Sequence, residues 1–80
     1  MVNTNKLRGK IVECGMNVSD LAEKIGIDKA TLYRKINSGG DGFTIRDVNL
    51  IARALNLGFD EINSIFFAVE VSDMRFMQGI

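Results

Sequence analysis

Glycine divides this chain of 80 residues into short segments, and each segment has the apolar spacing of a helix. Gly15, Gly26 and Gly58 each follow an apolar stripe, at the place where a glycine commonly ends a helix. A loop at 38–42 holds further glycines, and the chain has no proline. Short helices joined by tight turns can bury their stripes only against one another, so the pattern predicts one small all-α domain.

The apolar spacing predicts five helices. The first three cover about residues 4–14, 18–25 and 29–37, the fourth runs from Thr44 to Gly58, and the fifth begins at an Asp60 cap and ends near 66. The residues expected to face the core are Leu7, Ile11 and Cys14; Leu21, Ala22 and Ile25; Leu32 and Ile36; Val48, Ile51, Ala52 and Leu55; and Ile62, Ile65 and Phe66. Cys14 is expected to be a small buried hydrophobic residue rather than a redox-sensitive thiol.

Capping residues mark where several of these helices begin. Asn17 with Asp20, and Thr44 with Asp47, have the three-residue spacing of a capping box. Asp28 stands where the N-cap of the third helix is expected. The caps, the glycines and the apolar spacing therefore all indicate the same arrangement.

Composition excludes most kinds of catalytic and metal site. The chain has no His and one Cys, which rules out the usual zinc ligand sets, an internal disulfide and His-dependent catalysis. Asp60 and Glu61 fit a cap and a first-turn charge better than a catalytic pair. The glycine loop at 39–42 lacks the Lys and the Ser or Thr of a phosphate-binding loop and is expected to be a connector. We therefore expect no enzymatic activity, no cofactor, no metal and no small-molecule substrate.

The chain carries no signal for a membrane or for secretion. Its longest apolar run, 65–69, is far short of the roughly 20 residues that a spanning helix needs. A lone thiol also favours a reducing compartment. A cytoplasmic protein is expected.

The formal net charge of zero is an average over two unlike halves. Residues 1–40 hold seven basic and four acidic groups, whereas residues 41–80 hold three basic and six acidic groups. Such an asymmetry can mark a surface that meets a polyanion, although ordinary solvated surface charge produces it as well. The charge balance alone does not choose between these interpretations.

The second and third segments form the pattern of a helix-turn-helix. Ala22 is small where the two helices cross, and Gly26 suits the tight turn between them. Ile27 and Leu32 are placed to fill the wedge between the helices. The amino-terminal end of the third segment can then enter a DNA major groove, which is about 12 Å wide.

Residues 17–38, NVSDLAEKIGIDKATLYRKINS, resemble the helix-turn-helix of the phage Cro and repressor family, also called the xenobiotic-response-element family. Residues 43–62, FTIRDVNLIARALNLGFDEI, resemble the fourth and fifth helices of that family. The resemblance covers roughly residues 4–66. It implies a compact five-helix DNA-binding domain over 1–66, with the apolar tail at 67–80 outside it.

The resemblance also implies which side chains face DNA. The expected base contacts are Lys29, Ala30, Tyr33 and Arg34, and the expected phosphate contacts are Asn17, Asn37, Ser38, Thr44 and Arg46. Val18 departs from the family, since many members have a Gln there that reaches the DNA backbone. Anchoring at that point is expected to rest on backbone amides instead. The plainer alternative for the charged positions is a solvated helix face, and for Tyr33 it is packing.

The function implied is that of a sequence-specific transcriptional regulator, a Cro-like or stand-alone phage or prophage repressor that places helix 29–37 in the major groove. A homodimer on a pseudo-palindromic operator is expected, because one module makes few base contacts. The tail alternates in part as a short strand would, and the expected dimerisation residues are Phe66, Phe67, Val69 and Val71. The alternative is a protein-interaction module on the same scaffold, of antirepressor or antitoxin-like type.

Overall fold

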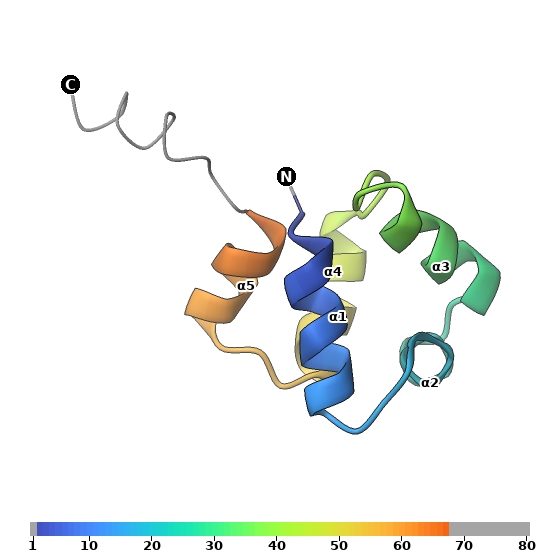
Figure 1. The fold of residues 1–80 in the computed structure, drawn as a ribbon, viewed down its shortest axis with the longest axis horizontal. Coiled ribbons are helices and arrows are strands. Elements are labelled where there is room, and N and C mark those ends of the chain that lie inside the picture. The colour runs from blue at the N-terminus through green and yellow to red at the C-terminus, as the bar shows by residue number, and fades with distance from the viewer. Residues whose placement is uncertain (1, 68–80) are drawn as a thin grey trace.

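A computed structural model describes residues 2–67, and over that range the chain is all-α. Its helices are α1 (Thr4–Glu13), α2 (Val18–Ile25), α3 (Lys29–Asn37), α4 (Ile45–Ala54) and α5 (Phe59–Phe66) (Figure 1). No strand occurs between residues 2 and 67, while the expected strand at Val69 and Val71 lies outside the described residues. The predicted all-α fold is confirmed.

Three predicted helix starts are confirmed in atomic detail. The Asn17 side chain accepts a hydrogen bond from the Asp20 amide, and the Asp20 carboxylate accepts one from the Asn17 amide in return. Thr44 and Asp47 form the same reciprocal box at α4. The Asp28 carboxylate accepts from two amides in the first turn of α3. Local side-chain chemistry therefore sets these boundaries.

The boundary between α4 and α5 differs from the prediction. Helix α4 ends at Ala54, and Asn56 turns the chain with a left-handed φ of 54°. Gly58 does not end α4 but is the N-cap of α5, with an extended φ of −79°. Asp60 is therefore not the cap and lies in the first turn. Since glycine has no capping side chain, Glu61 supplies the polar contact and accepts from the Gly58 amide at 3.1 Å.

The core is built from the predicted stripes of all five helices in the described part of the chain. Its most deeply buried members are Leu7, Ile11, Leu21, Leu32, Ile36, Ile51 and Ile65. Cys14 is the exception among the expected core residues, because it caps the carboxyl end of α1 and is exposed. Its thiol lies 3.7 Å from the Leu55 carbonyl oxygen, to which it donates.

Phe66 belongs to this core and not to a free surface. It is only 4% exposed, and its ring meets that of Phe43 edge to face at a centroid distance of 5.9 Å. Its expected part in dimerisation stays a prediction, made for a side chain that the single chain already buries. Phe67, the next residue, is 49% exposed.

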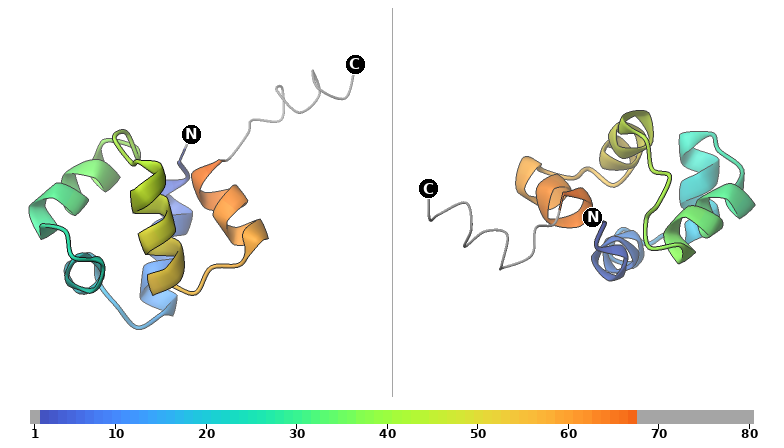
Figure 2. Two further views of the ribbon diagram at one scale, coloured as in Figure 1. Left: turned by 180° about the vertical axis from the view of Figure 1, so that it is seen from behind. Right: turned by 90° about the horizontal axis from the view of Figure 1, so that it is seen from above.

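Within the described residues, α3 and α5 lie at opposite ends of the helical domain (Figures 1 and 2). Helices α1 and α4 stand between them, with α5 packed against both. Helix α2 packs against α1, α3 and α4 and so joins α3 to the rest of the core. None of the helices described between residues 2 and 67 has the length and hydrophobicity of a membrane-spanning segment.

Candidate nucleic-acid interface

The turn between α2 and α3 places α3 on the surface. Gly26 has a left-handed φ of 77°, and the amides of Gly26 and Ile27 both donate to the Ala22 carbonyl, at 2.9 and 3.0 Å. Asp28 then caps α3 directly, so only three residues separate the two helices. This is the Schellman-type ending for which a glycine is favoured, because side chains rarely adopt this backbone conformation.

The residues predicted to support this turn lie where they were expected. Ala22 is 1% exposed and Leu32 is 0% exposed, while Ile27 is partly buried against the core. Small Ala22 lets α2 approach its neighbours closely, and Leu32 fills the space beneath α3. The helix-turn-helix geometry predicted from the sequence is thus present.

One face of α3 is open to solvent and carries the four predicted base-contact residues. Lys29 and Ala30 lie in its first turn, Tyr33 and Arg34 in its second, and all four are exposed. Neither Lys29 nor Arg34 forms an ion pair with a carboxylate among residues 2–67. Both cations therefore keep their donors available for an external partner.

The predicted phosphate-contact residues are exposed, but most of them already serve the fold. The oxygen atoms of Asn17 and Thr44 accept capping bonds at 2.8 and 3.1 Å. The Ser38 hydroxyl donates to the Lys35 carbonyl at 3.1 Å at the end of α3. The side-chain amino group of Asn17 and the hydroxyl hydrogen of Thr44 remain as donors. Arg46 is exposed in the first turn of α4.

Arg8 is a residue of this region that the sequence did not reveal. Its guanidinium donates to the Asn37 side-chain oxygen at 2.5 Å, which ties α1 to the last residue of α3. The bond orients the Asn37 amide, so that its amino group is left to donate elsewhere. The two residues stand 29 positions apart, and no local pattern in the chain indicates such a contact.

Lys35 is a basic residue of α3 that does not belong to the open face. Its ammonium lies 2.7 Å from the Asp47 carboxylate, and both side chains are largely buried. Burial opposes ionisation of Asp47, but hydrogen bonds from Lys35 and from the Thr44 amide outweigh it and leave the pKa of Asp47 below its ordinary value of 3.8. The Lys35 ammonium is therefore neutralised by Asp47 within the fold and is not one of the unpaired cations of α3.

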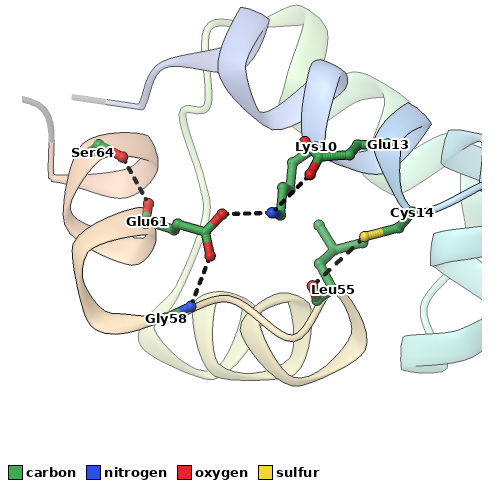
Figure 3. A network of polar contacts seen from close by, with 7 residues as sticks. All are labelled: Lys10, Glu13, Cys14, Leu55, Gly58, Glu61 and Ser64. Atoms are coloured by element: carbon green, nitrogen blue, oxygen red, sulfur yellow. Dashed lines mark hydrogen bonds and ion pairs between the residues drawn. The ribbon is translucent and has the colours of Figure 1, made fainter.

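Lys10 is likewise paired, where α1 meets α5. Its ammonium links α1 to α5 through a contact of 2.6 Å with Glu61, and it also lies 3.4 Å from Glu13 of α1 itself (Figure 3). The Lys10–Glu61 hydrogen bond raises the pKa of Lys10 and lowers the pKa of Glu61. With Lys10 and Lys35 occupied, the cations without an ion pair in the described amino-terminal half are Lys6, Arg8, Lys24, Lys29 and Arg34.

Comparison with known proteins agrees with this geometry. The model of the Cro/C1-type helix-turn-helix DNA-binding domain matches residues 6–67, which include all five helices except the first two residues of α1 and extend one residue past α5. No curated protein and no solved structure gives a significant match to the chain. The matched range covers most of the 80 residues. The chain therefore belongs to the Cro/C1-type helix-turn-helix family and is a DNA-binding transcription regulator.

Proposed function

We propose that the protein is a sequence-specific repressor that inserts the amino-terminal half of α3 into the major groove. The observation that carries this proposal is the open face of α3, where Lys29, Ala30, Tyr33 and Arg34 lie together with no internal ion pair in the described structure. In a member of this family, such a face is suited to reading base edges.

Each of the four residues has a chemistry that suits a base edge. The Arg34 guanidinium can donate two parallel hydrogen bonds to O6 and N7 of guanine, and the Lys29 ammonium can donate to a guanine or to a phosphate. Ala30 is small enough to contact a thymine methyl group. Tyr33, which is 40% exposed, can add a hydrogen bond to base or backbone.

Phosphate contacts would fix the register of α3 in the groove. The exposed side chains with a donor left for phosphate are Asn17 at the start of α2, Asn37 at the end of α3, and Thr44 and Arg46 at the start of α4. Ser38 would join them by exchanging the hydrogen bond that its hydroxyl donates to the Lys35 carbonyl. The free amides in the first turn of α2 support them, since Val18 is buried and offers no polar group. These contacts carry affinity and the base contacts carry specificity.

A homodimer on a pseudo-palindromic operator follows from the small number of base contacts that one module offers. Since Phe66 is buried, the large apolar side chains exposed at the two ends of α5 are Phe59, its first residue, which is 77% exposed, and Phe67, its C-cap, which is 49% exposed. Val69 and Val71, also expected in the dimer, lie outside the described residues. We infer a Cro-like or stand-alone phage or prophage repressor acting in the cytoplasm, because the matched domain and this apolar surface are what such a regulator requires.

Selection of binding sites from a random DNA pool tests this proposal. The expected result is a pseudo-palindromic consensus with half-site centres about one helical turn, roughly 34 Å, apart. A consensus of one half-site only would contradict the dimer, and enrichment of no sequence would contradict specific binding.

A second candidate is a protein-interaction module of antirepressor or antitoxin-like type. It is favoured by the zero net charge of the chain and by the exposure of Phe59 and Phe67. Binding to random duplex DNA at low salt separates the two, because a repressor of this family retains a non-specific electrostatic affinity. Absence of any such binding would favour the interaction module.

A further inference from the structure

The outer side of α4 carries a shallow hollow. Of the residues that line it, only Arg46 is among the proposed DNA contacts. Ile45, Arg46, Asn49, Leu50 and Arg53 line it, and no residue of α3 takes part. Their spacing places them along one side of the helix over its whole length. At about 1.5 Å per residue, α4 offers a strip roughly 15 Å long.

A second hollow continues this strip toward α2. It shares Leu50 and Arg53 with the first and adds Lys24, in the last turn of α2, with Ile25 and Ala54. Because the two hollows share residues, they form one continuous surface. We call this surface the α4 groove and define it by Lys24, Ile45, Arg46, Leu50 and Arg53.

The α4 groove combines an apolar floor with a basic rim. Ile45 is 69% exposed, an unusual state for an isoleucine, and Leu50 beside it is only partly buried. Lys24, Arg46 and Arg53 form no ion pair with any carboxylate within residues 2–67, and no acidic residue lines either hollow. A partner that fits must therefore bring both apolar groups and negative charge.

We propose that the α4 groove docks an acidic amphipathic helix from a partner protein. The apolar side of that helix would cover Ile45 and Leu50, and its flanking carboxylates would meet Arg46 and Arg53. Charge complementarity requires an anionic partner, and the exposed Ile45 selects an amphipathic helix over a nucleic acid, since a phosphate backbone brings no apolar surface to cover an isoleucine. About three helical turns of the partner match the length of α4.

The docking has a consequence that rests on the proposed function. Arg46 is both a residue of the α4 groove and a proposed phosphate contact at the start of α4. A helix seated in the groove engages Arg46 and places carboxylates beside the DNA-facing end of α4, where they repel phosphate. Partner and operator therefore compete, and the partner acts as an antagonist of DNA binding.

Docking can be measured without DNA, so that its outcome is independent of the proposed function. The probe is a fluorescent synthetic peptide of about four helical turns, with Leu at i, i+3, i+4 spacing and Glu on both flanks, titrated against the full chain at low salt. Saturable binding is expected, and we expect Ile45→Ser and Arg53→Gln each to weaken it about tenfold. Val12→Ser, which alters a 71% exposed valine on α1, is the matched control and should leave the affinity unchanged.

Two peptide controls sharpen the result. Replacing Glu by Gln removes the charge, and replacing Leu by Ser removes the apolar side, and both changes should abolish binding. The proposal is overturned if binding does not saturate, if Val12→Ser weakens it as much as Ile45→Ser, or if either control peptide binds equally well. A further pair of results would also overturn it. If Arg53→Gln lowers the salt dependence of binding to a random DNA duplex, and Ile45→Ser leaves the affinity for the peptide unchanged, then the α4 groove binds nucleic acid and not a helix. Failure of the peptide to displace DNA, with docking intact, contradicts only the competition.

Discussion

The Lys35 ammonium of α3 lies 2.7 Å from the Asp47 carboxylate of α4, and the same carboxylate accepts the Thr44 amide at the start of α4. One buried group therefore caps one helix and holds the carboxyl-terminal half of another. Together with the bond between Arg8 and Asn37, it secures the end of α3 that faces away from the proposed base contacts. Polar contacts as well as packing against the apolar core therefore hold α3 in the orientation that exposes its open face.

Removal of the Asp47 carboxylate should destabilise the fold. Asp47→Ala loses the cap of α4 and leaves the Lys35 ammonium without its partner, so we expect the free energy of unfolding to fall by about 2 kcal/mol. Urea denaturation measures this change. Asp41→Ala, at an exposed loop carboxylate, is the control and should change stability by less than about 0.5 kcal/mol. If Asp47→Ala lowered the free energy of unfolding as little as Asp41→Ala does, the contact between Lys35 and Asp47 would not stabilise the fold.

The same carboxylate should give the stability a dependence on pH. Because the folded-state pKa of Asp47 lies below 3.8, its contribution is present above that value and is lost as the pH falls through the lower, folded pKa. Asp47→Asn removes the titration of this carboxyl group. The contribution of Glu61 to the pH dependence is the same in the parent and in Asp47→Asn, so it cancels when their stabilities are subtracted. The stability difference between the parent and Asp47→Asn should therefore shrink below pH 3.8 in a series of urea titrations. A difference that stays constant through this range contradicts the assignment.

Two neighbouring glycines separate backbone strain from steric overlap. Gly40 has a φ of +88° and is packed so closely that a Cβ there would collide with the Val2 side chain, whereas Gly39, at +81°, faces open space. Gly39→Ala should lower stability by about 1 kcal/mol, the cost of the left-handed conformation alone. Gly40→Ala should cost about 2 to 3 kcal/mol because the overlap is added. Thermal unfolding of the pair checks this, and equal melting temperatures would contradict the packing of Val2 on Gly40.

Adjacent phenylalanines should affect folding and association separately. Phe66→Ala empties a core position and should lower the free energy of unfolding by about 3 to 4 kcal/mol. Phe67→Ser alters an exposed ring and should leave the fold intact while weakening the proposed dimer. Urea denaturation and sedimentation equilibrium distinguish these effects. A monomeric parent protein would contradict the proposed dimer, and an unchanged free energy of unfolding in Phe66→Ala would contradict the core assignment.

Helix starts were predictable from the sequence because capping is local chemistry. Asn17, Asp28 and Thr44 each satisfy amides within three residues, so their positions relative to the apolar stripe are sufficient. The role of Gly58 could not be predicted from local residue types, for a related reason. A glycine after one stripe and before the next can end the first helix or begin the second, and the left-handed turn at Asn56 is not visible in the residue types.

Contacts between distant helices could not be predicted in the same way. Whether Lys35 points toward solvent or toward Asp47, and whether Arg8 reaches Asn37, depends on how separate helices are placed and rotated against each other. Cys14 also shows this limit, since it continues the stripe of α1 in sequence but is the C-cap of that helix and is exposed. The open face of α3 was predictable, because its residues lie opposite Leu32 and Ile36 on a single helix.

The central claim is that the open face of α3 reads base edges, and the affinity of the Arg34→Ala variant tests it most directly. Fluorescence anisotropy would compare the selected operator with a scrambled duplex over a series of salt concentrations, with Lys6→Ala as the control for loss of one exposed cation. The account predicts that Arg34→Ala reduces discrimination between the two duplexes by about 1 to 3 kcal/mol, while Lys6→Ala leaves discrimination unchanged. Unaltered discrimination and an unaltered salt slope in Arg34→Ala would contradict it.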